Sequence, residues 1–154
     1  MIETGIRATA AVRGLLPELD SMLTAATTAA AHARAPYSGY HVGAAVLDER
    51  GEITAGCNVE SGAYGATVCA ERGAIAAAVA GGATGLRACV TVTRDADPAS
   101  CCGICRQLLA EFGRDLIVVN GSTSTDTLRW GRLEDWLPFG FALQGDPESA
   151  GTAG

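Results

Sequence analysis

The sequence predicts an α/β fold in which a mixed β-sheet carries helices on its faces. Helix-like and strand-like segments alternate along the second half of the 154-residue chain. Such alternation is typical of parallel strands joined by helical crossovers. Two strand-like segments joined by a short turn come earlier and add antiparallel pairing. Ligands in sheets of this kind bind where strands end and helices begin, so the functional site is expected there.

The first half of the chain predicts one helix followed by a hairpin. Residues 15–34 carry apolar side chains at a helical period, with Pro17 in the first turn and Pro36 beyond the end. Residues 41–48 and 52–57 are strand-like and are joined by a short polar turn, which predicts a β-hairpin.

The second half predicts helices and strands in turn. Residues 68–81 are rich in alanine, favour a helix and end at two glycines. Residues 86–93 alternate and are β-branched, and residues 116–119 are apolar throughout, as in a buried strand. Further expected elements are a helix over 103–112, a polar loop over 122–126 and a short helix over 133–137. Residues 1–143 are expected to form one domain, and residues 144–154 a flexible C-terminal tail.

Composition and charge argue against several classes of function. The chain has 11 basic residues, all arginine and widely scattered, against 17 acidic residues, which gives a net charge of −6. A protein that grips a nucleic-acid backbone usually has a basic surplus, so no polynucleotide partner is expected. No run of 18 apolar residues occurs, so no membrane span is expected. An early acidic residue, Glu3, and the lack of an apolar signal core lead us to expect a cytoplasmic protein.

Small side chains dominate the apolar residues. The chain contains 29 alanines, whereas aromatic residues make up only 5%. Such a chain has few large side chains with which to fill a core. We therefore expect contacts between subunits to complete its burial.

The cysteines favour a metal or a reactive thiol over disulfides. There are six of them, and Cys101, Cys102 and Cys105 crowd into five positions. Disulfides are rare in a reducing compartment, and a chain of this length does not need them to fold. Cys102 and Cys105 have a spacing at which both sulfurs can reach one tetrahedral ion, and Cys69 can supply a third. Cys101 is an alternative to Cys102, although its spacing to Cys105 is longer.

Three protein ligands predict a catalytic zinc site, because they leave one position open for water. Cys69 and Cys102 each follow a loop and open an expected helix, where free N–H groups and the helix dipole favour a thiolate. Glu71 lies two residues after Cys69 and could move protons without binding the metal. Three thiolates would weaken the ion as a Lewis acid. Hydrogen bonds from Arg72 and Arg106 to sulfur could restore that strength.

These segments belong to a wider set of motifs between about Pro36 and Phe141. In chain order they are Pro36-Tyr37-Ser38, Val42-Gly43-Ala44-Ala45, Gly56-Cys57-Asn58-Val59-Glu60, Cys69-Ala70-Glu71-Arg72, Cys102-Gly103-Ile104-Cys105-Arg106-Gln107 and Leu137-Pro138. With them the chain resembles the cytidine deaminases of the short, single-domain type.

The resemblance implies a three-layer α/β/α sandwich with a mixed five-stranded sheet, assembled as a homotetramer. It implies one Zn²⁺ per subunit held by Cys69, Cys102 and Cys105, with Glu71 as the proton shuttle. The implied reaction is the hydrolytic deamination of cytidine or deoxycytidine to uridine or deoxyuridine, with release of ammonia, in pyrimidine salvage.

The resemblance also assigns substrate contacts. Asn58 and Glu60 correspond to the family's ribose-binding pair, and Tyr40 stands where a phenylalanine commonly lines the pyrimidine pocket. Ala70 is a further implied substrate contact. Tyr64 and Phe141 match aromatic positions used at or across subunit contacts, and Phe141 is expected to reach the substrate.

Three departures from the family pattern leave the substrate open. Cys101 replaces a proline, Ser61 replaces an asparagine, and Tyr40 adds a hydroxyl. A modified cytosine nucleoside, as in nucleoside-antibiotic metabolism, is therefore an alternative substrate. A non-catalytic module that binds zinc or a nucleoside is a less favoured alternative, since a structural site has no use for Glu71.

Overall fold

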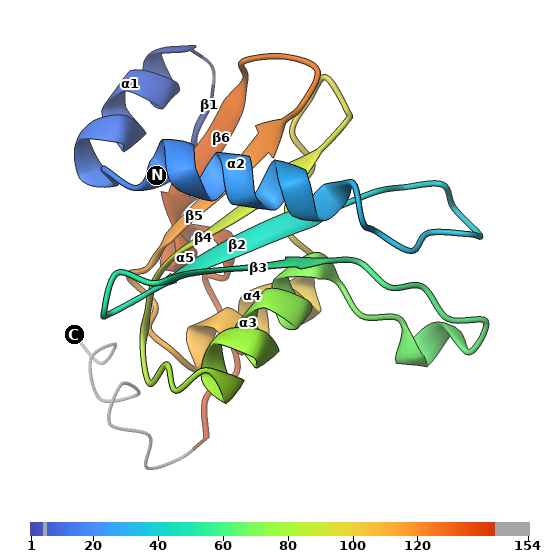
Figure 1. Ribbon diagram of the computed structural model, residues 1–154. Helices are drawn as coiled ribbons and strands as arrows, with labels where there is room; N and C mark the ends of the chain where they lie inside the picture. The colour runs from blue at the N-terminus through green and yellow to red at the C-terminus, as the bar shows by residue number, and fades with distance from the viewer. Residues whose placement is uncertain (5, 144–154) are drawn as a thin grey trace.

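A six-stranded β-sheet lies at the centre of the protein, with helices on both faces (Figure 1). The structure, a computed structural model, describes residues 1–4 and 6–143. The strands lie in the order β1-β6-β5-β4-β2-β3. Their bounds are Glu3–Thr4 (β1), Gly43–Asp48 (β2), Ile53–Cys57 (β3), Leu86–Thr93 (β4), Ile117–Ser122 (β5) and Leu128–Arg132 (β6). The helices are Ile6–Leu15 (α1), Leu19–Ala30 (α2), Ala70–Ala80 (α3), Gly103–Ala110 (α4) and Leu133–Trp136 (α5), with a 3₁₀ turn at Tyr64–Ala66.

The three-layer sandwich is confirmed, but the expectation of five strands was wrong. The sixth strand is β1, which pairs antiparallel with β6 at the sheet edge. A two-residue strand has no periodicity that a sequence can display. Strand β6 was also missed, because only two of its five residues, Leu128 and Trp130, are large and apolar, which is too few to display a period.

The helix expected over residues 15–34 is α2, but its bounds were wrong and α1 was not expected. The chain forms two helices, α1 and α2, and Pro17 lies in the turn between them. Helix α2 ends at Ala30, before the expected boundary. Its buried residues Leu19, Met22 and Ala26 pack on the sheet, as their helical spacing predicted.

Two glycines let helices approach the sheet closely. A Cβ at Gly43 would lie 1.8 Å from the carbonyl oxygen of Ala26 in α2. A Cβ at Gly56 would lie 2.5 Å from the backbone nitrogen of Ala74 in α3. Helix α3 therefore packs backbone to backbone against β3, which fixes the position of its N-terminus.

The topology brings the starts of α3 and α4 together on one face of the sheet. Strands β4 and β5 are parallel and are connected through α4, whereas every other pair in the sheet is antiparallel. The loop over 94–102 leaves the carboxyl end of β4 and enters α4 beside α3. None of the described helices is long and apolar enough to cross a membrane. The expected tail over 144–154 lies outside the described residues.

Candidate active site

Three cysteine sulfurs meet where α3 and α4 begin. Cys69 is the N-cap residue of α3, Cys102 is the N-cap residue of α4, and Cys105 lies in the first turn of α4. Cys102 Sγ is 3.7 Å from Cys69 Sγ and 3.4 Å from Cys105 Sγ, and all three sulfurs lie within 4.8 Å of one another. Zn–S bonds of about 2.3 Å in a tetrahedron place sulfurs about 3.8 Å apart. The cluster therefore fits a zinc ion.

The structure separates Cys101 from this cluster. Its side chain is buried in the core beneath α4, where burial raises the pKa of the thiol to about 12. The sulfur that faces Cys69 and Cys105 is that of Cys102. His32 is exposed just after the end of α2 and does not belong to the sulfur cluster.

The environment favours a thiolate at Cys69. Its pKa is lowered to about 5, first by a hydrogen bond from Cys105 and further by Cys102 and Arg72. The same contact raises the pKa of Cys105. Arg72 lies in the first turn of α3 and donates a hydrogen bond to the carbonyl oxygen of Thr67, two residues before Cys69. A low thiol pKa at a helix N-terminus is typical of metal-binding or reactive cysteines.

Glu71 is a buried carboxylate beside the sulfur cluster. Only 3% of the residue is exposed, and burial raises its pKa, with a further contribution from Cys69. Cys69 caps α3 and Glu71 lies in its first turn, so their relative position is rigid. A buried carboxyl group with a raised pKa is a candidate for taking up and releasing protons during a reaction.

A cavity of about 230 Å³ opens next to Glu71 and the sulfurs. Pockets that hold drug-sized ligands have volumes of about 300–1,000 Å³, so this one suits a single small molecule. It is lined by Tyr40, Val42, Asn58, Glu60, Thr67, Cys69, Ala70, Glu71, Thr91, Thr93, Ala99, Ser100 and Cys102. Four of the five expected substrate contacts thus line one cavity.

Asn58 and Glu60 hold the loop that precedes β2. Asn58 Oδ1 accepts a 2.9 Å hydrogen bond from the N–H of Val42, and its Nδ2 donates to the carbonyl oxygen of Tyr40 at 2.8 Å. Glu60 accepts hydrogen bonds from the N–H groups of Tyr37 and Ser38 and from the Ser38 hydroxyl. The hydrogen bond from Ser38 Oγ is the main cause that lowers the pKa of Glu60. Glu60 is therefore an ionised acceptor at the cavity wall.

Tyr40 connects this loop to the loop after β4. Its hydroxyl donates a 2.8 Å hydrogen bond to Asp95 Oδ2. Partial burial is the main cause that raises the pKa of Tyr40, and Asp95 adds to the effect. The phenol is therefore neutral at pH 7 and can serve as a donor.

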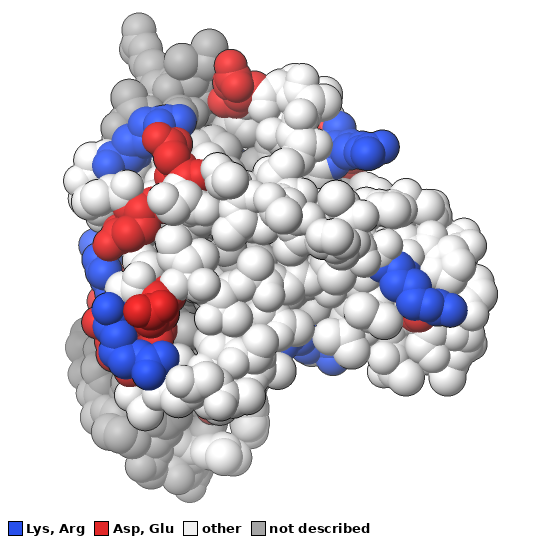
Figure 2. All heavy atoms as spheres, viewed as in Figure 1, with Lys and Arg blue, Asp and Glu red and all other residues white. Residues whose placement is uncertain are grey.

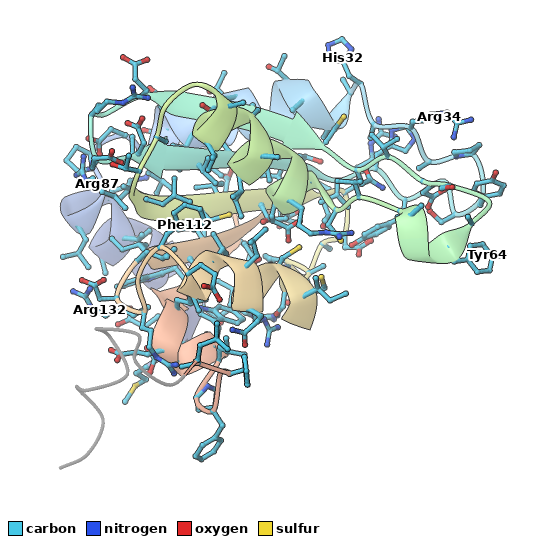
Figure 3. The ribbon with its side chains drawn as sticks, turned by 90° about the horizontal axis from the view of Figure 1, so that it is seen from below. His32, Arg34, Tyr64, Arg87, Phe112 and Arg132 are labelled. Carbon is cyan, nitrogen blue, oxygen red and sulfur yellow. The ribbon has the colours of Figure 1, made fainter. Side chains whose placement is uncertain are left out.

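The remaining expected site residues lie outside the cavity. Phe141 is 69% exposed, and its backbone exchanges two hydrogen bonds with the side chain of Gln107. Tyr64 is 83% exposed and lies at the outer end of the loop between β3 and α3 (Figure 3). The expected hydrogen bond from Arg106 to a zinc-binding sulfur stays a prediction. The guanidinium of Arg106 donates to the carbonyl oxygens of Cys101 and Trp136, because the residue projects toward α5.

Several residues at the site carried no recognisable motif. Asn120 is fully buried in β5 and accepts a hydrogen bond from the N–H of Cys101. Asp95 becomes a partner of Tyr40 only through the loop conformation. Thr91 and Thr93 line the cavity. The alternating pattern of β4 predicted a strand, but it did not show that these two hydroxyl side chains face the site.

Comparison with known proteins agrees with this geometry. The family model for the cytidine and deoxycytidylate deaminase zinc-binding region matches residues 17–120. A cytidine deaminase from Mycobacterium tuberculosis is 39% identical over 134 residues, which cover 86% of this chain and 97% of the relative. The crystal structure of cytidine deaminase from Burkholderia pseudomallei superposes with a TM-score of 0.75 at 38% identity, over 79% of this chain and 98% of that one. The chain belongs to the cytidine and deoxycytidylate deaminase family.

Proposed function

We propose that the protein is a zinc-dependent hydrolase that converts cytidine and deoxycytidine to uridine and deoxyuridine, with release of ammonia. The observation that carries the proposal is the buried Glu71 carboxylate beside three convergent thiols at the end of a cavity for a small molecule. A site that held zinc for structure alone would use a fourth protein ligand and would need no carboxylate there.

The reaction replaces the amino group at C4 of the pyrimidine with oxygen from water. Cys69, Cys102 and Cys105 would hold a zinc ion, which would supply the Lewis acid that makes water a better nucleophile near neutral pH. Glu71 takes a proton from the attacking water and gives it to N3 of the ring. It then takes the second proton of the water and delivers it to the amino group as the C4–N bond breaks, so that ammonia leaves.

The cavity wall supports recognition of a nucleoside. Ala70 opens α3, where backbone N–H groups lack partners within the helix, and one of them can donate to the ring carbonyl O2. Asn58 and Glu60 line the same cavity, and Glu60 Oε1 has a lone pair for the 3′-hydroxyl of the sugar. The flat ring of Tyr40 can cover the base. A site built on such hydrogen bonds discriminates against ligands that lack the matching groups.

We further propose that the protein acts as a homotetramer in pyrimidine salvage in the cytoplasm. Tyr64, Phe139 and Phe141 are strongly exposed aromatic residues, and a subunit contact would cover them. In the view of Figure 1, the described side chains in the middle of the face over β3 and α3 carry no charge (Figure 2). Phe141 would then reach the substrate site of a neighbouring subunit. Six free cysteines fit a reducing compartment.

The substrate is tested by measuring ammonia release from cytidine, deoxycytidine, cytosine and a short deoxycytidine oligonucleotide. The proposal predicts turnover of the two nucleosides and at least tenfold slower turnover of the base and of the oligonucleotide. Faster turnover of the oligonucleotide would overturn it. The cytidine deaminase relatives do not favour a modified cytosine nucleoside as the natural substrate.

A further inference from the structure

Asn120 lies at the base of the loop that delivers Cys102 to the sulfur cluster. Its side-chain oxygen accepts a 3.1 Å hydrogen bond from the backbone N–H of Cys101, and both residues are buried. Cys101 directly precedes Cys102, the N-cap residue of α4. We propose that Asn120 is a positioning residue that fixes the peptide before Cys102 and so keeps this sulfur in place for zinc.

A second contact holds the other end of the same residue. The Nε of Arg106 donates a 2.8 Å hydrogen bond to the carbonyl oxygen of Cys101. Arg106 is itself held by Trp136, whose carbonyl oxygen accepts from the guanidinium at 3.0 Å and whose ring lies 5.5 Å from it. Cys101 is therefore fixed through its N–H by β5 and through its carbonyl by α4, so the peptide that leads into Cys102 has little freedom to rotate.

The acceptor sits on a rigid part of the fold. Strand β5 lies between β4 and β6 in the sheet, and Asn120 is paired in register with Thr91 of the parallel neighbour. By contrast, most of the loop over 94–100 is exposed. Without Asn120, the buried N–H of Cys101 would lose its partner, and the loop would shift to satisfy it. A proline at position 101 would carry no N–H and would not need this acceptor.

Substitutions at positions 120 and 101 form a double-mutant cycle. Asn120→Leu removes the acceptor at similar volume, Cys101→Pro removes the donor, and Cys101→Ala removes the thiol but keeps the donor. The readout is the rate at which a chromogenic chelator takes zinc from the loaded protein. Groups that orient metal ligands typically contribute 10–100-fold to metal affinity. We therefore expect Asn120→Leu to speed zinc release about tenfold in the wild-type and Cys101→Ala backgrounds, and not in the Cys101→Pro background.

A second measurement does not depend on the proline variant. Hydrogen–deuterium exchange at the Cys101 amide should be at least tenfold faster in Asn120→Leu than in the wild type. Ser122→Ala, two residues further along β5, is the matched control. It should change neither the rate of zinc release nor the rate of exchange at the Cys101 amide. Equal zinc release from wild type and Asn120→Leu, an equal effect in all three backgrounds, or unchanged exchange at Cys101 would each overturn the proposal.

The inference rests on the proposed zinc site, yet the two can fail separately. Wild-type protein that binds less than one zinc per chain would refute the site itself. One zinc per chain, together with Asn120 variants that release zinc at the wild-type rate, would refute only the positioning role.

Discussion

The Tyr40 hydroxyl donates a 2.8 Å hydrogen bond to Asp95 Oδ2 and so joins the loop before β2 to the loop after β4. Both loops contribute to the wall of the cavity, the first through Tyr40 and the second through Ala99 and Ser100. The contact therefore ties together two parts of the wall that are distant in sequence.

Tyr40→Phe removes this bond and keeps the aromatic ring. A net hydrogen bond contributes about 1 kcal/mol, so we expect the KM for cytidine to rise about fivefold, with a smaller change in kcat. Steady-state kinetics measures both constants. Asp95→Ala should reproduce the effect, whereas Asp95→Asn keeps an acceptor and should resemble the wild type. An unchanged KM in both Tyr40→Phe and Asp95→Ala would show that the contact does not shape the site.

Glu60→Gln weakens both the hydrogen bonds that hold the loop before β2 and the proposed contact with the sugar. The carboxylate accepts three hydrogen bonds from Tyr37 and Ser38, and an amide offers only one acceptor oxygen. We expect the KM for cytidine to rise about tenfold or more, with kcat changed less, because Glu60 contacts no reacting atom in the proposed mechanism. A loss of kcat at unchanged KM would contradict the assignment.

Cys102→Ser tests the metal ligands. Loss of one thiolate from three should lower zinc affinity by at least about tenfold, as measured by competition with a chelator. Cys57→Ser is the matched control, since Cys57 is a free, half-buried cysteine outside the sulfur cluster. Tight zinc binding by Cys102→Ser, or a similar loss in both variants, would refute the ligand set.

Glu71→Gln should change the pH dependence of stability in the zinc-free protein. Burial raises the pKa of Glu71 above its ordinary value of 4.5. As the pH rises from 4.5 to the higher pKa of the folded state, the unfolded chain releases a proton that the folded chain retains. The contribution of Glu71 to stability is thus fully present below pH 4.5 and is lost across this window.

The variant lacks this titration, so its stability relative to the wild type should increase between pH 4.5 and pH 8. Urea unfolding of both proteins at a series of pH values, under reducing conditions, measures the difference. A difference that does not vary with pH would show that the Glu71 carboxyl is not perturbed in the folded protein.

Local patterns predicted most of the fold around the site. The hairpin of β2 and β3, the helix α3 and the strand β4 each carry a period or a turn that belongs to their own segment. Strand β1 depends on pairing with Trp130 and Arg129 at the other end of the chain, and no local pattern encodes that. Helix α1 was missed, and the start of α2 was placed too early because apolar spacing continues through Leu15, Leu16 and Leu19 across Pro17.

The site residues show the same contrast between local patterns and contacts with distant segments. Cys69 and Glu71, and likewise Cys102 and Cys105, share a helix start, so sequence spacing alone brought each pair together. The partners that hold the loops come from elsewhere: Asn120 meets Cys101 only through the parallel register of β4 and β5. The carbonyl partners of Arg106 were missed because spacing along a helix does not show which neighbouring element its long side chain reaches.

We propose that Glu71 moves protons at the zinc site of a cytidine-deaminating enzyme. The direct measurement is ammonia release from cytidine by purified wild-type and Glu71→Gln protein, with zinc content determined for both. We predict one zinc per chain in each protein and a turnover at least about 100-fold lower in the variant. Comparable turnover in the two proteins would contradict the role of Glu71. No turnover by zinc-loaded wild type would contradict the deaminase activity itself.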